Sequence, residues 1–598
     1  MDKPPTSGPP VGIDLGTTFS VVATLDAQGR PRSIQNAEGD ITTPSVVMFD
    51  RESVIVGKEA VKLASFDPEA IAAYAKRDIG ATRFGKAIRG HHLPPEVVQS
   101  FVLRKLKADA ELKIGPIRQA VVTVPAYFNE PRRKATQDAG RLAGLEILDI
   151  LNEPTAAAIA FGVERGFLSP DGEVAKPETV LVYDLGGGTF DVTLMRLEGH
   201  DYTALATASD VYLGGIDWDQ RIVNYVATRF ITQHGGLDPR ENPSTLVRLL
   251  CEAEDAKRAL TARDDVNITL EHEGRMLRTP LTRADFEQMT SNLLERTRFT
   301  INKVLREANH TWKDVTRLLL VGGSSRMPQV HRMLRDETGL EPDRSLSADE
   351  AVAHGAAIYA GYLLAGRNKA VHFTAVGNIT NVSSHDLGVL GTEAATGRPR
   401  RRMIIRHNSR LPITKGGRFH TQYDNQRSVL ARVVEGGDDS GLNATVIGTC
   451  VISNLPADLP ALTPVDVIFR YQDNGRLVVH ARLPNQKIEA TTEIKRDSGL
   501  SEAELQDWTQ RIAEGRLLPK TLPAEEEEEL VEAIIEDHPA VGGPEAAVFA
   551  ETLPEGSPEF DFSGYDSQPR GKPVEPPSPP IAHKLDDPAL DEFFRNLE

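Results

Sequence analysis

The chain has 598 residues, 40% of them hydrophobic and 26% charged, which is ordinary for a soluble globular protein. Its length exceeds what one hydrophobic core sustains, so we expect several folded units. No apolar run approaches the ~20 residues of a membrane-spanning helix, the N-terminus lacks the apolar stretch of a secretion signal, and the two cysteines lie too far apart in sequence to indicate a zinc site or a disulfide framework. We therefore expect a protein of the reducing cytoplasm that does not bind membranes.

The net charge of −18 is concentrated near the end of the chain. Residues 514–598 carry 21 acidic and 6 basic side chains and 13 of the 39 prolines. This composition buries too little apolar surface to offset chain entropy, so we predict a disordered acidic tail over 515–584. The preceding 513 residues carry a net charge of only −3, so nucleic-acid binding through a basic patch is not supported.

The first folded unit is predicted over residues 11–370, after a disordered N-terminus over 1–10. Strand-like runs such as Ala120–Val124, Thr179–Tyr183 and Arg317–Val321 alternate there with helix-like segments. That alternation predicts an α/β domain.

Two glycine-rich loops of this unit share one pattern. Gly12–Thr18 and Asp184–Asp191 each place an aspartate, then glycines, then threonine beside a strand-like run. Glycines let backbone N–H groups approach phosphate oxygens, hydroxyl groups add donors, and an aspartate can hold hydrated Mg²⁺. One such loop alone is more often an ordinary hairpin turn. Two matching loops predict duplicated halves that close on a nucleotide.

Three further segments carry polar groups suited to the rest of a nucleotide. Leu320–Arg326 follows a buried strand and opens a helix, so its backbone can pass close to an adenosine while Arg326 stacks on the base. Asn152–Ala158 places the carboxylate of Glu153 just before a helix. Four residues fall within about two turns of one predicted helix and could grip ribose and base: Glu254, Lys257, Arg258 and Thr261. The alternative for these four is a solvated charged face.

A second folded unit is predicted over 386–498, after a linker over 371–385. Short runs such as Leu430–Val434 and Arg476–Arg482 alternate with period two, and Asp473–Gly475 is a hairpin turn signal. This pattern predicts an antiparallel β-sandwich.

A short helix is predicted over 499–514, because Ser501 and Glu504 form a capping box and the apolar residues that follow share one face. Another helix is predicted at 585–598, opened by Asp587–Pro588. Its apolar positions follow the spacing of a helix that binds in a groove: Leu590, Phe593, Phe594 and Leu597. It would either recruit a dedicated partner or dock on its own domain.

With these motifs in view, the chain resembles the heat-shock protein 70 (DnaK-type) chaperone family over roughly residues 11–512. The resemblance is carried by six segments: Gly12–Ser20, Val122–Asn129, Ile150–Ala158, Asp184–Val192, Leu213–Asp217 and Val321–Met327. It implies an α/β actin-like ATPase domain with ribonuclease H-like duplicated halves, followed by a peptide-binding antiparallel β-sandwich and the disordered acidic tail. It also implies hydrolysis of ATP to ADP and phosphate that modulates the binding of extended apolar polypeptide segments.

The resemblance implies a role for each site residue. Asp14 and Asp184 would organise Mg²⁺, with K⁺ as a further candidate cofactor. Lys76 would orient the attacking water, because phosphoryl transfer needs an in-line water and charge neutralisation. Glu153 and Asp191 would assist Lys76 in orienting the water and the γ-phosphate. Thr17 and Thr18 would bind the β-phosphate, and Thr189 would bind the γ-phosphate. The remaining nucleotide contacts would be Gly16, Gly186, Gly187, Gly188, Gly214, Gly215, Glu254, Lys257, Arg258, Thr261, Gly322, Gly323, Ser324, Arg326 and Asp349.

The resemblance also implies partners and a signal between the two domains. Pro125 and Arg133 match the interdomain switch region of the family. Four apolar residues are candidates for the peptide groove, with ordinary sandwich core as the alternative: Leu387, Val389, Phe419 and Val429. The implied partners are unfolded or extended polypeptides, a J-domain cochaperone and a nucleotide-exchange factor.

Two of the departures from the family pattern concern the control of peptide binding. The family has a leucine-rich acidic linker where this chain has His372–Ser384, and the acidic tail stands where the family has a helical lid. We therefore expect fast peptide exchange under modest nucleotide control. A different class of function is an ATP-switched interaction scaffold or sensor that recruits a partner through the terminal helix. A small-molecule kinase of the same superfamily is disfavoured by the C-terminal β-sandwich.

Overall fold

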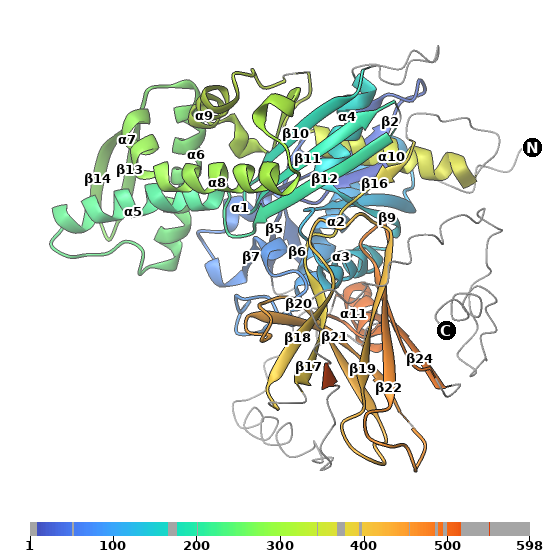
Figure 1. Cartoon of the computed structure of the whole chain (residues 1–598). Coiled ribbons are helices and arrows are strands. Elements are labelled where there is room, and N and C mark those ends of the chain that lie inside the picture. The colour runs from blue at the N-terminus through green and yellow to red at the C-terminus, as the bar shows by residue number, and fades with distance from the viewer. Residues whose placement is uncertain are drawn as a thin grey trace, which may run out of the picture. The chain divides into compact units, whose positions relative to one another are not determined.

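The computed structural model describes residues 9–50, 53–164, 176–199, 201–343, 345–367, 377–393, 397–453, 455–484, 488–493, 499–515 and 549–550. The chain divides into two compact units, Met1–Asp561 and Phe562–Glu598. The second unit lies wholly outside the described residues, as does the predicted helix over 585–598. The first unit contains both predicted domains (Figure 1).

Two β-sheets of matching topology form the centre of the nucleotide-binding domain. The first has the order β3-β2-β1-β8-β9, and the second has the order β15-β10-β11-β12-β16. In each sheet a central strand, β1 or β10, runs antiparallel to the hairpin strand that follows it and parallel to a later strand, β8 or β15. This repetition confirms the duplicated α/β fold.

The first sheet contains β1 (Val11–Asp14), β2 (Phe19–Leu25), β3 (Pro31–Ser33), β8 (Gln119–Val124) and β9 (Glu146–Asn152), with β4 (Thr43–Pro44) paired to β2. The second sheet contains β10 (Glu178–Leu185), β11 (Phe190–Glu198), β12 (Asp201–Asp210), β15 (Arg317–Val321) and β16 (Ile379–Thr380).

Two alanine-rich helices pack together beside these sheets, α4 (Glu153–Glu164) and α10 (Ala351–Arg367) (Figure 1). Small residues allow the backbones to approach closely: a Cβ at Gly355 would lie 1.8 Å from Ala156 O, and a Cβ at Gly12 would lie 2.1 Å from Ala357 N. Their alanines share one buried apolar cluster with residues of β8, β10 and β15. The two sheets thus share one apolar core with these helices.

The remaining elements of this domain surround the two sheets. They are α1 (Lys58–Leu63), α2 (Pro95–Ile114), α3 (Glu130–Leu142), β5 (Val46–Phe49), β6 (Val54–Val56), β7 (Ile71–Ala73), α5 (Gly215–Gln233), α6 (Pro243–Ala262), β13 (Asp265–His272), β14 (Arg275–Thr282), α7 (Arg283–Met289), α8 (Ser291–Glu307) and α9 (Pro328–Thr338). Short 3₁₀ helices are η1 (Pro68–Ala70), η2 (Ala75–Arg77), η3 (Trp312–Asp314) and η4 (Gly323–Arg326).

The second domain is the predicted β-sandwich, in which every strand pairing except one is antiparallel. Its strands are β17 (Leu387–Glu393), β18 (Pro399–Ile405), β19 (Ile413–His420), β20 (Val429–Gly436), β21 (Ala444–Ile452), β22 (Pro464–Tyr471), β23 (Leu477–Leu483), β24 (Ile488–Glu493) and β25 (Phe549–Ala550). The turn at Asp473–Gly475 joins β22 to β23, with Gly475 at a φ of 79°.

Two described elements follow residue 498, the predicted end of the sandwich, in the sequence. Helix α11 (Glu502–Glu514) begins at the predicted Ser501 capping box, but its Leu505 and Ile512 belong to the same apolar cluster as residues of α2 and α3 in the nucleotide-binding domain. Phe549–Ala550 forms strand β25, which corrects the prediction of disorder at these two residues of the tail. The predicted absence of a lid concerns residues outside the described part of the chain.

Candidate nucleotide site

The two glycine-rich loops meet at a cleft of about 490 Å³. Asp14 is the last residue of β1, and Asp184 is the penultimate residue of β10. The duplicated topology therefore brings the ends of equivalent strands to one place. The predicted residues that line the cleft are Asp14, Gly16, Thr17, Thr18, Lys76, Glu153, Asp184, Gly186, Gly187, Thr189, Glu254, Lys257, Arg258, Thr261, Gly322, Gly323, Ser324, Arg326 and Asp349. Gly188, Asp191, Gly214 and Gly215 are not among the lining residues.

The loops press against each other so closely that only glycine fits at the contact. A Cβ at Gly187 would lie 2.3 Å from Thr18 Oγ1, and a Cβ at Gly188 would lie 2.5 Å from Thr17 Cγ2. A Cβ at Gly214 would likewise lie 2.6 Å from the backbone of Gly187. The glycines thus allow the loops of the two halves to pack against each other.

A buried ion pair lies at one end of the cleft. Lys76 Nζ is 2.6 Å from Glu153 Oε1, and the two side chains are 4% and 9% exposed. Lys76 belongs to η2, while Glu153 is the first residue of α4, directly after β9. A Glu–Pro pair that ends a buried strand and opens a helix therefore aims its carboxylate at the lysine.

Three aspartates lie near this pair. Burial, and then the charge of Glu153, raise the pKa of Asp14 and of Asp191 to about 7 and that of Asp184 well above its usual range. Lys76 acts in the opposite direction on all three. Four carboxyl groups around one ammonium leave an excess of negative charge, which a divalent cation would neutralise.

The outer part of the cleft carries the residues predicted to hold ribose and base. Lys257 Nζ is 2.8 Å from Asp219 Oδ2 and donates to Gly215 O at 3.1 Å. Arg258 pairs with Glu254 at 2.7 Å, and its guanidinium lies 4.9 Å from the centroid of the Phe19 ring. Arg326 pairs with Asp349 at 2.5 Å. The four α6 residues therefore face the cleft, and not solvent alone.

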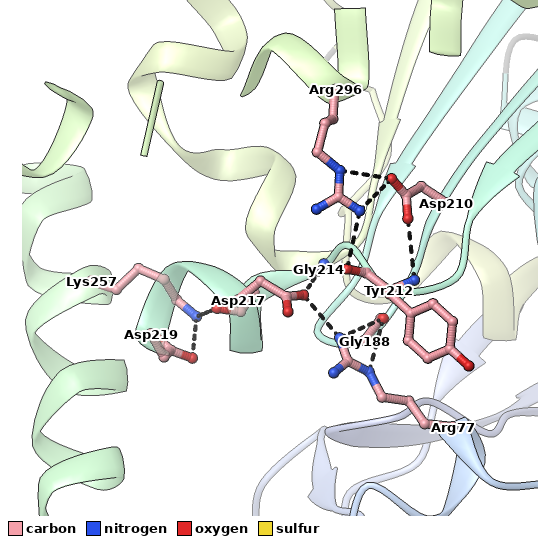
Figure 2. A network of polar contacts seen from close by, with 10 residues as sticks. Arg77, Gly188, Asp210, Tyr212, Gly214, Asp217, Asp219, Lys257 and Arg296 are labelled. Carbon is pink, nitrogen blue, oxygen red and sulfur yellow. Dashed lines mark hydrogen bonds and ion pairs between the residues drawn. The ribbon is translucent and has the colours of Figure 1, made fainter. Parts of the chain in front are cut away.

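Sequence reasoning missed a bridge between the two halves, shown in Figure 2. Arg77 donates from Nε and Nη2 to Gly188 O at 3.1 and 2.9 Å, and from Nη2 to Asp217 Oδ2 at 2.9 Å. The same carboxylate oxygen accepts from Gly214 N at 2.8 Å and caps α5. Arg77 adjoins Lys76 in the sequence, but side-chain direction in a single 3₁₀ turn is not readable from sequence.

Arg133, predicted as a switch residue, lies between the two domains. Its guanidinium is buried and donates to Phe128 O at 2.7 Å, to Asn152 Oδ1 at 2.6 Å and to Asn474 O at 3.5 Å. Asn474 belongs to the β22–β23 turn of the sandwich. Pro125, which follows β8, is buried in the same region and accepts from Phe128 N through its carbonyl.

The described part of the linker, residues 377–385, contributes to the contact between the two domains. Its strand β16 pairs in parallel with β12, through Tyr202 and Thr203. Asn381, just beyond β16, accepts from Asn152 Nδ2 at 3.2 Å and donates to Asp473 O at 2.9 Å. Although its sequence departs from the family pattern, the linker thus extends the sheet of the nucleotide-binding domain.

A second contact between the domains involves His385 and Glu435. His385 Nε2 lies 2.8 Å from Tyr127 O, and His385 Nδ1 lies 3.2 Å from Glu435 Oε1. Burial lowers the pKa of His385 to about 4 and raises the pKa of Glu435 to about 7. A neutral His385 that donates from Nε2 to Tyr127 O has no proton on Nδ1, so Nδ1 can only accept a hydrogen bond. Glu435 can donate that bond only when its carboxyl group is protonated.

The four residues predicted for the peptide groove lie in the core of the sandwich. Leu387, Val389, Phe419 and Val429 are at most 3% exposed and share one apolar cluster. Their side chains therefore stabilise the sandwich, as the alternative interpretation predicts.

The described residues contain neither a helix suited to crossing a bilayer nor a metal cage of protein ligands. No described helix is both long and apolar enough to cross a bilayer. No three described histidine, cysteine or acidic side chains converge into a metal cage of protein ligands alone. Mg²⁺ keeps several waters and usually binds through one or two carboxylates plus substrate phosphates, so the acidic cluster fits a hydrated ion bound together with a nucleotide.

Comparison with known proteins identifies the family. The sequence matches the family described as Hsp70 protein over residues 10–88 and 82–536. It is 38% identical to the Chaperone protein DnaK of Mesomycoplasma hyopneumoniae (strain J) over 513 residues, which cover 85% of this chain and 82% of the relative. The duplicated ATPase fold, the nucleotide cleft and the β-sandwich agree with that match. The chain belongs to the Hsp70 family and is an ATP-dependent chaperone with ATPase activity.

Proposed function

We propose that the acidic cluster around Lys76 binds Mg²⁺–ATP and that the Lys76–Glu153 pair positions the water that attacks the γ-phosphate. The observation that carries this proposal is the buried ion pair at 2.6 Å, surrounded by three aspartates whose pKa values burial raises. Asp14 and Asp184 would hold the hydrated Mg²⁺, which neutralises charge on the phosphates when bound. K⁺ is a further candidate at the same cluster.

Each residue around the phosphates would have its own role in hydrolysis. Glu153 holds the Lys76 ammonium in place, so that its free N–H bonds can point to the water and to a phosphate oxygen. Asp191, hydrogen-bonded by the Ser209 hydroxyl, would accept from the water. Thr17 and Thr18 would donate to the β-phosphate and Thr189 to the γ-phosphate. The arrangement supplies positioning and charge stabilisation, which phosphoryl transfer requires.

Single-turnover hydrolysis of ATP tests these roles. We expect Lys76→Ala to lower the rate at least 100-fold with ATP still bound, because the lost group acts on the water. Lys113→Ala, which removes an exposed lysine at the end of α2, should hydrolyse at the wild-type rate. A Lys76→Ala rate within threefold of wild type would refute the assignment.

We further propose that the contact around Asn152 carries the nucleotide signal to the sandwich. Asn152 immediately precedes Glu153 in the chain, and it contacts both Arg133 and Asn381. These residues in turn contact the carbonyls of Asn474 and Asp473 in the β22–β23 turn. A shift of Glu153 on hydrolysis would thus reach the sandwich through Asn152 and then, along either of two routes, through one further residue and two hydrogen bonds.

The partners of the chain follow the family at a coarse level: polypeptide clients and cochaperones. We propose that the clients are extended apolar segments of unfolded chains, which pair by backbone hydrogen bonds with the sandwich. We also propose a J-domain cochaperone, a nucleotide-exchange factor and a cytoplasmic location. Recruitment of a dedicated partner through residues 585–598 stays a prediction.

A further inference from the structure

Tyr74, in the wall of the nucleotide cleft, has a left-handed backbone. It is the single residue between strand β7, which ends at Ala73, and the 3₁₀ helix η2, which begins at Ala75. Its φ of 63° and ψ of 23° lie in a region that glycine and asparagine adopt readily and bulky residues do not. The conformation is therefore strained for a tyrosine and persists only where the surrounding structure imposes it.

Contacts on both sides of Tyr74 impose this backbone. Before it, Ala73 pairs with Val46 in the small sheet of β5, β6 and β7. After it, Arg77 N donates to Tyr74 O at 2.9 Å in the turn of η2, and Lys76 of the same turn is buried. The chain must therefore change direction within one residue. Glycine would allow this turn without strain, so a tyrosine here indicates that its ring has a function.

The ring of Tyr74 is not part of the hydrophobic core. The residues around it, Ile71–Ala73 and Ala75, belong to or pack against two apolar clusters of this half of the domain. Tyr74 itself is in none of the described clusters. The residue is only partly buried, and it lines the cleft. Core packing therefore does not explain the tyrosine.

The second half of the domain faces Tyr74 through helix α6. Val247, Cys251 and Glu254 lie at i, i+4 and i+7, so they share one face of this helix. Val247 packs against the apolar cluster that contains Ile71 of β7. Burial, then Glu254 and more weakly Cys251, raise the pKa of the Tyr74 phenol, which places these two α6 residues beside it. Glu254 also lines the cleft. Tyr74 thus lies at the rim, where the contact between the halves ends and the cleft begins.

The position of Tyr74 along the cleft selects the part of a nucleotide that its ring meets. Lys76, two residues later, lies at the phosphate end of the proposed site. Glu254, on the opposite side, belongs to the residues predicted to hold ribose and base. The part of a nucleotide between the phosphates and the base is its sugar. Because the pKa of the phenol is raised, the ring stays uncharged at neutral pH and offers the sugar an apolar face.

We propose that Tyr74 is a nucleotide-binding residue whose ring packs against the sugar at the rim of the cleft and slows the release of ADP. This inference rests on the proposed function, which places the phosphates of the nucleotide at Lys76. The left-handed turn brings the ring to this point of the rim, which explains why a tyrosine occupies the turn despite the strain.

Release of radiolabelled ADP from the full chain in the presence of Mg²⁺ tests the proposal. The ADP must be otherwise unmodified, because a dye on the sugar would alter the proposed contact. The variants are Tyr74→Gly, which removes the ring and accepts the positive φ, and Tyr74→Phe, which keeps the ring. The control is Phe66→Gly, since Phe66 is an aromatic residue of the same half and is 80% exposed.

We expect Tyr74→Gly to release ADP about tenfold faster than the wild type, and Tyr74→Phe and Phe66→Gly to stay within about twofold of it. Mg²⁺–pyrophosphate, which has no sugar, should compete with ADP for the wild type and for Tyr74→Gly with the same inhibition constant. Without nucleotide, Tyr74→Gly should unfold thermally no lower than the wild type, because glycine relieves the strain of the turn. Tyr74→Asn, which also tolerates a left-handed backbone, should reproduce each result.

Four outcomes would overturn the proposal. Release of ADP from Tyr74→Gly at the wild-type rate would show that the ring does not hold the nucleotide, and it would leave the proposed function standing. An equal loss of affinity for ADP and for pyrophosphate would show that the residue acts on the phosphates. Thermal unfolding of both Tyr74→Gly and Tyr74→Asn well below the wild type would make Tyr74 a structural residue. No binding of Mg²⁺–ADP to the wild type would reject both this proposal and the proposed function.

Discussion

Replacing Lys76 by methionine should destabilise the nucleotide-free protein in a way that depends on pH. The substitution keeps most of the side-chain volume but removes the one cation among Glu153 and the three aspartates. Loss of one partner of a buried ion pair typically costs about 3–5 kcal/mol. Because Lys76 also lowers the pKa of each aspartate, its removal raises these pKa values further.

The direction in which stability changes with pH follows from the number of protons that the folded and unfolded states bind. The pKa of Asp14 and of Asp191 rises from 3.8 to about 7 on folding, so the folded protein binds protons more tightly than the unfolded chain between these values. The contribution of these groups to stability therefore falls as pH rises from about 4 to 7. At pH 5.5 both are protonated in the folded state, and fewer charges remain unpaired when Lys76 is removed.

Thermal unfolding at pH 5.5 and pH 8, with and without Mg²⁺–ADP, measures this effect. We expect Lys76→Met to unfold several degrees below wild type at pH 8 and closer to it at pH 5.5. Added Mg²⁺–ADP should recover part of the loss, since a bound cation replaces the missing charge. A loss of equal size at both pH values, or one no larger than that of Lys113→Ala, would refute the electrostatic account of the cluster.

Three further changes test other contacts. Gly187→Ala should weaken ATP binding at least tenfold in calorimetric titration, because the added Cβ would lie 2.3 Å from Thr18 Oγ1. The control is Gly85→Ala, whose added Cβ would meet only the flexible Asp78 carboxylate at 3.3 Å, and it should bind ATP as the wild type does. Glu435→Gln should leave stability unchanged near pH 4.5 and raise it by up to about 3 kcal/mol at pH 8, because burial raises the pKa of that carboxyl from 4.5 to about 7. Equal stability of wild type and variant at pH 8 in thermal unfolding would contradict this. Asn381→Ala should keep basal hydrolysis and lose stimulation by peptide, and unchanged stimulation would argue against a signal through the linker.

The nucleotide site could be predicted because its chemistry constrains residue types locally. An aspartate at the end of a buried strand, followed by glycines and threonine, appears in both loops, and the structure brings Asp14 and Asp184 to one cleft. The capping box at Ser501 and the turn at Gly475 were likewise predictable, since each depends on residues close together in sequence.

The features that sequence reasoning missed depend on contacts between distant segments. Arg77 bridges to Gly188 and Asp217 across the cleft, and nothing in the sequence distinguishes it from a surface arginine. The apolar face of α11 was predictable, but not the α2 and α3 helices that it packs against. Composition predicted disorder throughout the tail because a run of five apolar residues is too short to outweigh its acidic surroundings, although two of its residues form β25.

The most direct test of the account measures steady-state ATP hydrolysis by the full chain with and without saturating extended apolar peptide, with Lys76→Ala as the control. The account predicts that peptide stimulates hydrolysis and that the variant is inactive, because Asn152 connects the Glu153–Lys76 pair to the sandwich. Hydrolysis at the same rate with and without peptide would contradict the proposed coupling between the two domains.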